Sequence, residues 1–304
     1  NRPLYLKKAL NSLVNIRHIN EWEVFISIDH SDCVDEIFKI IDGFKQYINI
    51  KTFYNKKKLG VRNNPISCLE KAYQEGSQTF LLYEDDIEIS RDSLEFISLT
   101  MNLKDWDKRF SCGNLHLSSC NNKAHLNNNF NHLNEIVIET FFLSSLGLFF
   151  SRNQYRKFIK PNWLNKNLTI RKFDGERCWG WDLSLNENLL LNDKPCIQSL
   201  VPRVRHFGKK GTYSTDDWYK ISYFHAGLYE GKDQLSKVKF FNSETIKDQF
   251  DNLNDWIYIY NISEQLWRLQ KSVIKREIKF KRKIKILLLI ILILLLKSLI
   301  IIFL

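Results

Sequence analysis

Short apolar runs alternate with amphipathic segments through the first third of the chain. Residues 4–14 show the period of an amphipathic helix that opens at Pro3, and the same period returns at 33–44 and 64–76. Compact apolar runs rich in β-branched and aromatic residues separate and follow these helices, at 23–28, 50–54 and 79–83. This alternation predicts an α/β fold with a mostly parallel sheet flanked by helices.

Local signals suggest where several elements begin and end. Asn64-Pro65 is expected to open the third helix, and Gly76 is expected to end it. No strand-like run precedes Pro3, although a sheet of this kind usually begins with a strand, so we expect a first strand upstream of Asn1. The second half is less regular and predicts a strand, a helix and a polar basic loop, at 146–150, 182–191 and 201–219.

Composition divides the chain into three segments. Residues 1–260 form the expected globular domain, 261–285 a basic amphipathic helix, and 286–304 an almost wholly apolar run. Between residues 268 and 304 ten basic side chains stand against one acid, so this segment carries +9 of the chain's net +11. The near-neutral remainder argues against a nucleic-acid-binding surface.

The apolar run at 286–304 is long enough to approach the thickness of a bilayer. As a helix it would extend about 28 Å at ~1.5 Å per residue, close to the depth of a hydrocarbon core. Lys297 interrupts the run, but it lies past the middle and could reach the far interface. A helix buried against a partner is the alternative. We favour a membrane-associated or transmembrane tail, and the basic cluster before it predicts that the globular domain lies on the cytoplasmic side.

Three consecutive acids, Glu84-Asp85-Asp86, follow the predicted strand at 79–83. The carboxyl ends of parallel strands are where such sheets bind ligands. Neighbouring carboxylates repel one another, and a divalent cation removes that cost. Because Mg²⁺ and Mn²⁺ prefer carboxylate oxygens and often bridge to substrate phosphates, the pattern predicts a metal and diphosphate site. A solvated acidic turn that starts the next helix, with Ser90 as its cap, is the alternative.

Two segments carry a family resemblance. Residues 83–96, Tyr-Glu-Asp-Asp-Ile-Glu-Ile-Ser-Arg-Asp-Ser-Leu-Glu-Phe, resemble the N-acetylglucosaminyltransferase I family (alpha-1,3-mannosyl-glycoprotein 2-beta-N-acetylglucosaminyltransferase), which uses a Glu-Asp-Asp metal motif. Residues 206–211, His-Phe-Gly-Lys-Lys-Gly, are similar to that family's loop over the donor phosphates. The resemblance covers most of residues 1–225. It implies a GT-A (Rossmann-like) fold and an inverting transfer from a UDP-sugar, with N-acetylglucosamine as the suggested sugar, to a glycan on a lipid, protein or polysaccharide.

The resemblance also implies a set of metal and sugar contacts. It makes Asp86 the ligand of a Mn²⁺ or Mg²⁺ ion, while Glu84 and Asp85 contact the sugar or ribose. His206 is a candidate second metal ligand, as in some GT-A enzymes, and a structural role is the alternative for a lone histidine.

The nucleotide contacts follow from the same resemblance. Arg2 and Asp29 are implied to hold the nucleotide, and Lys209 and Lys210 to face the diphosphate. The family's serine contact in the phosphate loop is assigned here to Ser214, although the neighbouring residues 212 and 213 also carry hydroxyl groups. A solvated basic loop is the alternative for the two lysines.

The general base is expected in residues 178–183, Cys-Trp-Gly-Trp-Asp-Leu, where the family has a Trp-Asp-rich segment. Asp182 is the candidate, with Asp174 and Glu176 as rivals, because the family's paired aspartates are reduced to one here. A helix N-cap is the alternative role for Asp182.

The cysteines bear on the compartment. Cys112 and Cys196 match two cysteines that are bridged in the family, which would imply a lumenal domain. Two other functions stay open for the chain as a whole. One is a more distant GT-A transferase with another nucleotide-sugar donor, or a nucleotidyltransferase. The other is a membrane-anchored nucleotide-sugar-binding protein with a degenerate site.

Overall fold

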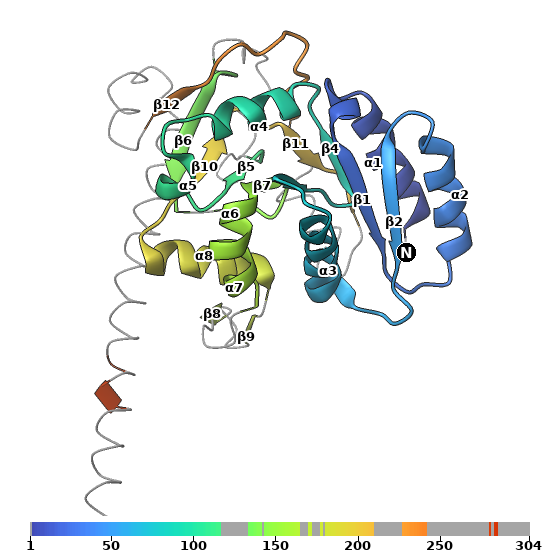
Figure 1. Cartoon of the computed structure of the whole chain (residues 1–304), viewed down its shortest axis with the longest axis horizontal. Helices are drawn as coiled ribbons and strands as arrows, with labels where there is room; N and C mark the ends of the chain where they lie inside the picture. The colour runs from blue at the N-terminus through green and yellow to red at the C-terminus, as the bar shows by residue number, and fades with distance from the viewer. Residues whose placement is uncertain are drawn as a thin grey trace, which may run out of the picture.

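In the computed structural model the described residues are 2–116, 133–141, 143–164, 170–171, 177–178, 180–209, 227–241, 280 and 283–284. They form an α/β structure whose first elements match the sequence pattern closely (Figure 1). Helices α1 (Pro3–Val14) and α2 (Val34–Phe44) alternate with strands β1 (Glu23–Ile28) and β2 (Asn49–Tyr54). A short 3-10 turn, Ile19–Glu21, links α1 to β1.

Strands β1 and β2 pair in parallel, in a register from Glu23 opposite Asn49 to Ile28 opposite Tyr54. Side chains of β1 alternate between two hydrophobic clusters. Val24 and Ile26 pack with the cluster that holds the buried faces of α1 and α2, whereas Phe25 packs with the cluster that holds α3 (Gly60–Gln74). The strand pair is therefore covered on both sides, as Figure 1 shows on the right of the molecule.

Helix α3 begins four residues before the predicted start at Asn64-Pro65, so Pro65 lies inside it. The Asp29 carboxylate explains the earlier start, because it accepts hydrogen bonds of 2.7 Å from the backbone nitrogens of Leu59 and of Gly60. These amides belong to the helix start, where donors have no partner within the helix. A distant carboxylate satisfies them, and no local sequence signal reveals it.

The central sheet contains β3 (Thr79–Leu82), β5 (Gly113–Asn114), β6 (Ile136–Thr140), β7 (Leu148–Ser151), β10 (Cys196–Ser199) and β12 (Lys239–Phe241). Its strand order is β12-β6-β10-β5-β7-β3. Only β12–β6 and β10–β5 pair in parallel, while β6–β10, β5–β7 and β7–β3 are antiparallel. The predicted mostly parallel sheet is therefore wrong, and the sheet is mixed. Apolar runs mark buried strands but do not encode their direction.

The acidic turn leads into a strand rather than a helix. Strand β4 (Ile87–Ile89) follows Asp86 and pairs antiparallel with β11 (Val204–His206). Helix α4 (Ser93–Met101) starts only afterwards, with Asp92 rather than Ser90 at its N-cap position. The predicted alternative of an acidic turn capped by Ser90 is therefore wrong.

The remaining elements surround the sheet. They are α5 (Trp106–Arg109), α6 (Arg152–Gln154), a π turn at Tyr155–Ile159, α7 (Lys160–Asn162), β8 (Ile170–Arg171), β9 (Arg177–Cys178) and α8 (Trp181–Asn192). Trp163 and Trp181 stack at 4.4 Å between ring centroids, and Trp163 Nε1 donates to the Arg62 carbonyl at 2.7 Å. These contacts hold the start of α8 close to the start of α3.

Two further sequence expectations are the membrane-associated tail and a bridge between Cys112 and Cys196. The apolar segment 286–304 and nearly all of 261–285 lie outside the described residues. Among the helices that are described, none combines the length and the apolar character needed to cross a membrane. Cys112 immediately precedes β5 and Cys196 begins the neighbouring β10, where Ile197 N donates to Cys112 O. Both cysteines are buried and neither forms a disulfide, so the bridge expected from the resemblance is not formed.

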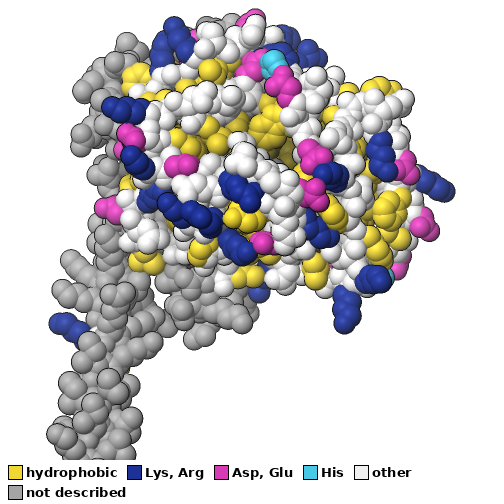
Figure 2. Space-filling model, viewed as in Figure 1, with side chains coloured by type: hydrophobic (Ala, Val, Ile, Leu, Met, Phe, Trp, Pro, Cys, Tyr) yellow, Lys and Arg dark blue, Asp and Glu magenta, His cyan; other side chains and the backbone are white. Residues whose placement is uncertain are grey.

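Lysine and arginine side chains are scattered over the face shown in Figure 2 and are interspersed with acids. This distribution agrees with the near-neutral charge that the sequence assigns to the domain. A basic stripe typical of a nucleic-acid-binding surface does not stand out on this face.

Candidate functional site

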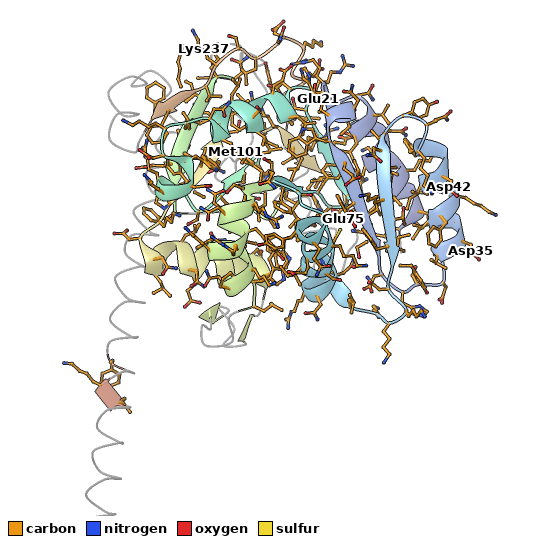
Figure 3. All side chains as sticks on the ribbon, viewed as in Figure 1. Glu21, Asp35, Asp42, Glu75, Met101 and Lys237 are labelled. Atoms are coloured by element: carbon orange, nitrogen blue, oxygen red, sulfur yellow. The ribbon has the colours of Figure 1, made fainter. Side chains whose placement is uncertain are left out.

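The turn between β3 and β4 carries the three acids. The Tyr83 hydroxyl donates to the Ile87 carbonyl at 2.6 Å and so closes the turn across Glu84-Asp85-Asp86. Asp86 is buried at 5 % exposure, whereas Glu84 and Asp85 are half-buried. Asp35 and Asp42 differ from Asp86, since both are exposed and project outward from α2 (Figure 3).

Strand β11 brings His206 to this turn. Its register places His206 opposite Ile87, so the residue after the ladder lies beside Asp86. Phe207 N donates to the Asp86 carbonyl at 2.9 Å, and His206 Nε2 lies 3.3 Å from Asp86 Oδ2. The two predicted metal ligands, which are far apart in sequence, are therefore neighbours.

Gly208 allows the loop after β11 to lie directly against the Asp86 carboxylate. A Cβ atom at this position would lie 2.6 Å from Asp86 Oδ2 and 2.9 Å from Asp86 Cβ. Real Cβ atoms essentially never approach so closely. The glycine of the Phe-Gly-Lys-Lys-Gly motif is thus required by the proximity of backbone and carboxylate.

Arg2 completes the cluster from the start of α1. Its guanidinium donates from Nε to Asp85 Oδ2 at 3.2 Å and from Nη2 to Asp85 Oδ1, and its Nη1 donates to Asp86 Oδ2 at 2.6 Å. The arginine carbonyl accepts the amides of Tyr5 and Leu6, so the backbone at Arg2 is fixed by the first turn of the helix.

The two oxygens of Asp86 have different surroundings. Oδ2 interacts with both Arg2 and His206, whereas Oδ1 is buried and has no hydrogen-bond partner among the described residues. Burial alone would raise the pKa of Asp86, but the hydrogen bond and charge of His206 and the charge of Arg2 outweigh it and lower the pKa. The carboxylate is therefore charged and has one oxygen available for a cation.

A divalent cation fits these donors. Asp86 Oδ1 and His206 are an oxygen and a nitrogen ligand of the kind that Mn²⁺ accepts. Within the described residues no group of three or more His, Cys, Asp or Glu side chains is arranged to hold a metal. A cation bound here would therefore take its other ligands from water and from a diphosphate, as Mg²⁺ and Mn²⁺ commonly do at phosphate sites.

Two further carboxylates face the same region. Burial, followed by the charges of Asp86, Asp85 and Asp182, raises the pKa of Glu84 to about 8. The charge of Asp182, at the start of α8, is thus one of the charges that act on the acidic turn. Burial likewise raises the pKa of Asp182, and hydrogen bonds from the backbone amides of Leu183 and of Asp182 itself partly offset that effect.

The alternative prediction that Asp182 is a helix N-cap is wrong. Gly180 is the N-cap residue of α8, and Asp182 lies two positions into the helix. A Cβ atom at Gly180 would collide with Asp182 Oδ1, so the glycine makes room for the carboxylate. The rivals Asp174 and Glu176 lie outside the described residues.

The nucleotide contacts implied by the resemblance are more dispersed. Asp29 follows β1 as expected, and its carboxylate already accepts the Leu59 and Gly60 amides. Lys209 is exposed just after Gly208, and Lys210 and Ser214 lie outside the described residues. The structure thus brings together Arg2, the acidic turn and His206, and it holds Asp29 at the start of α3.

Two residues of α1 that the sequence analysis missed also hold the loop after β11. The rings of Tyr5 and Phe207 meet edge to face at 5.6 Å between centroids, and Lys8 Nζ lies 4.0 Å from the centroid of the Phe207 ring. Tyr5 and Lys8 are three positions apart and share one face of the helix. That spacing could have indicated a shared contact surface, but it is equally typical of an ordinary amphipathic helix.

Comparisons with known proteins leave the family open. No protein-family model matches the chain. Among solved structures, the chain is similar to the mannosyltransferase PcManGT from Pyrobaculum calidifontis in complex with GDP-Man and Mn²⁺, with a TM-score of 0.43 and 10% sequence identity. The match covers 67% of this chain and 55% of that chain, so this chain corresponds to little more than half of that protein. A similarity at this level decides neither fold family nor function, which must be argued from the site.

Proposed function

We propose that this chain is a divalent-metal-dependent glycosyltransferase that takes its sugar from a nucleotide diphosphate donor. One observation carries the proposal. Asp86, in the turn between β3 and β4, is a buried carboxylate with one oxygen lacking a partner among the described residues, and His206 and Arg2 surround the other. A buried polar oxygen without a hydrogen-bond partner destabilises the folded protein unless a ligand supplies the missing interaction.

The arrangement suits the departure of a nucleoside diphosphate. Breaking the bond between sugar and diphosphate develops negative charge on the leaving oxygen, and that charge must be neutralised for the bond to break readily. A Mn²⁺ or Mg²⁺ ion on Asp86 would supply the neutralisation when bound. Arg2, which already lies between two carboxylates, and the loop that carries Lys209 are the cationic groups of the protein at the same place.

The acceptor side of the proposal rests on Asp182. An inverting transfer needs one carboxylate that takes the proton of the acceptor hydroxyl as its oxygen attacks the anomeric carbon. Asp182 is half-buried, its charge contributes to the raised pKa of Glu84, and burial raises its own pKa. A base with a raised pKa holds a proton better than an ordinary aspartate does, and this helps it to act near neutral pH.

The donor's identity depends on the sequence resemblance rather than on the structure. We propose UDP-N-acetylglucosamine as the first donor to test, with Glu84 and Asp85 toward the sugar and Asp29 toward the nucleoside. The acceptor is proposed to be a glycan on a lipid, protein or polysaccharide.

The test is nucleotide release from a panel of UDP- and GDP-sugars, with Mn²⁺ and with chelator. We expect release that requires the metal, and we expect Asp86→Asn to reduce it by roughly 100-fold or more, since one charge-stabilising group commonly contributes that much. Asp42→Asn, an exposed acid on α2 that pairs only with Lys45 in the described structure, is the matched control and should leave release unchanged. Metal-bound nucleotide without turnover of any donor would instead indicate a binding protein and would refute the enzyme.

A further inference from the structure

Arg2 interacts with the carboxylates that the proposed metal would use. Its side chain is only 28% exposed, and its guanidinium reaches both Asp85 and Asp86. The Tyr5 ring lies 5.1 Å from the guanidinium carbon, and the first turn of α1 anchors the arginine backbone. The side chain therefore sits in a defined place, while its partial exposure leaves room for it to turn away from the acids.

A guanidinium and a divalent cation cannot both be neighbours of Asp86 without repelling each other. Arg2 Nη1 lies 2.6 Å from Oδ2, and Oδ1 of the same carboxylate is the oxygen without a partner in the described structure. A cation on Oδ1 would lie within a few ångströms of the arginine charge in a half-buried setting, where screening by water is weak.

We infer that Arg2 is the site's own counter-ion, so that the guanidinium excludes a free divalent cation and releases the acids only when metal and nucleotide diphosphate enter together. The inference rests on the proposed function, because it presumes that Asp86 binds metal. The diphosphate supplies two negative groups, to which the released guanidinium can donate in the bidentate manner that arginine favours. Metal affinity and nucleotide affinity are then coupled through one side chain.

The coupling predicts opposite effects of one substitution on two ligands. Mn²⁺ binding, measured by electron paramagnetic resonance of the free ion, should be weak in the wild-type protein and should tighten by about tenfold or more when UDP is present. In Arg2→Ala, Mn²⁺ alone should bind about tenfold more tightly than in wild type, because its competitor is gone. UDP should bind this variant more weakly at saturating Mn²⁺, since the diphosphate loses its arginine.

Two further variants make the experiment specific. Arg2→Lys keeps a cation but lacks the planar guanidinium fork that donates to Asp85 and Asp86 together, so its Mn²⁺ affinity should fall between those of wild type and Arg2→Ala. It also tests the inference if the alanine variant folds poorly. Arg205→Ala is the matched control, because Arg205 is a nearby, 40% exposed arginine that pairs with Glu88 rather than with Asp85 or Asp86. It should bind Mn²⁺ and UDP as wild type does.

The outcomes separate this inference from the proposed function. Equal Mn²⁺ affinity in wild type and Arg2→Ala, together with metal-dependent donor turnover, would overturn the counter-ion role and leave the enzyme standing. An absence of Mn²⁺ binding in every variant, with or without UDP, would remove both. A third outcome is that UDP binds tightly without metal and that Arg2→Ala weakens this binding. The guanidinium would then bind the diphosphate in place of a metal ion, and the inference would be wrong.

Discussion

At the scale of single residues, the carboxylates of the site differ mainly in how far neighbouring charges offset the effect of burial on their pKa values. Asp86 stays charged because His206 and Arg2 outweigh the effect of burial, whereas burial dominates at Glu84 and Asp182 and raises both pKa values. Carboxylates whose pKa values are pushed apart can serve different roles in one reaction. Asp86 suits the binding of a cation, and Asp182 suits the transfer of a proton.

We therefore predict separate effects for substitutions at these two aspartates. Asp182→Asn keeps the size of the side chain but cannot take a proton, so donor-to-acceptor transfer should fall by roughly 10²–10⁴-fold. UDP affinity, measured by titration calorimetry with Mn²⁺, should stay within about twofold of wild type because the nucleotide site is intact. Normal transfer in Asp182→Asn would show that another group acts as the base.

A buried histidine beside the site predicts how stability depends on pH. Burial lowers the pKa of His116 to about 4, helped by the nearby charge of His206, and its Nδ1 lies 2.9 Å from the Ser144 hydroxyl. An unfolded chain binds this proton near pH 6.5, so the stabilisation is complete above that pH and is lost as pH falls from about 6.5 toward 4. The loss should be on the order of 3 kcal/mol.

Urea unfolding at pH 7 and at pH 4.5 can measure this contribution. His116→Gln, whose amide can still bond Ser144, should lose less stability between the two pH values than wild type does. The control is His18→Gln, because His18 is exposed and Glu21 raises its pKa. This variant should keep the acid-sensitive behaviour of wild type, and identical pH dependence in all three proteins would exclude His116 as its source.

At the scale of elements, the pairing of β4 with β11 builds the site. Glu88 lies opposite Arg205 in this ladder, and His206 lies opposite Ile87, so the ladder ends where Asp86 begins. The loop after β11 can then run beside the carboxylate only because Gly208 has no side chain. The geometry of two short strands thus determines the position of both proposed metal ligands.

Adding a single methyl group tests this geometry. Gly208→Ala should push the Asp86 carboxylate or the loop aside and weaken Mn²⁺ binding by roughly tenfold or more, since the added carbon would lie 2.6 Å from Oδ2. Gly43→Ala in α2, where no atom lies within 4 Å, is the matched control. It should leave binding unchanged and raise stability by about 0.5–1 kcal/mol. Unaltered Mn²⁺ affinity in Gly208→Ala would contradict the close packing.

The sequence predicted individual elements better than it predicted their pairing. The bounds of α1, α2 and β1 follow from hydrophobic period, which is a local property. The mixed sheet and the early start of α3 depend on distant partners, namely β7 between β3 and β5, and Asp29. The acidic turn could be proposed as a candidate site from three adjacent charges, but the contact of Arg2 with Asp85 and Asp86 joins positions more than 80 apart.

At the scale of the whole molecule, residues 227–241 tie the distant parts of the domain together. Arg17 donates to Glu95 on α4 and to the carbonyls of Gly231 and Asp233, and β12 adds a strand to β6. Beneath them the fully buried pair Arg203–Asp92 joins β11 to the start of α4. Leu235, Val238 and Phe240 pack with the hydrophobic cluster that also holds the buried faces of α1 and α2, so residues 227–241 are anchored to this part of the core.

The last prediction concerns residues 286–304, which the sequence assigns to a membrane. Their high leucine and isoleucine content, interrupted only by Lys297 and Ser298, and the preceding basic cluster predict that the full chain sediments with membranes, and that deleting 286–304 moves it to the soluble fraction. Replacing Lys281, Arg282 and Lys283 by glutamine is the matched control. It should weaken binding to anionic vesicles while leaving the interaction with neutral vesicles intact, because only the electrostatic attraction is removed. Membrane sedimentation that persists after the deletion would show that another part of the chain, or a partner, makes the contact.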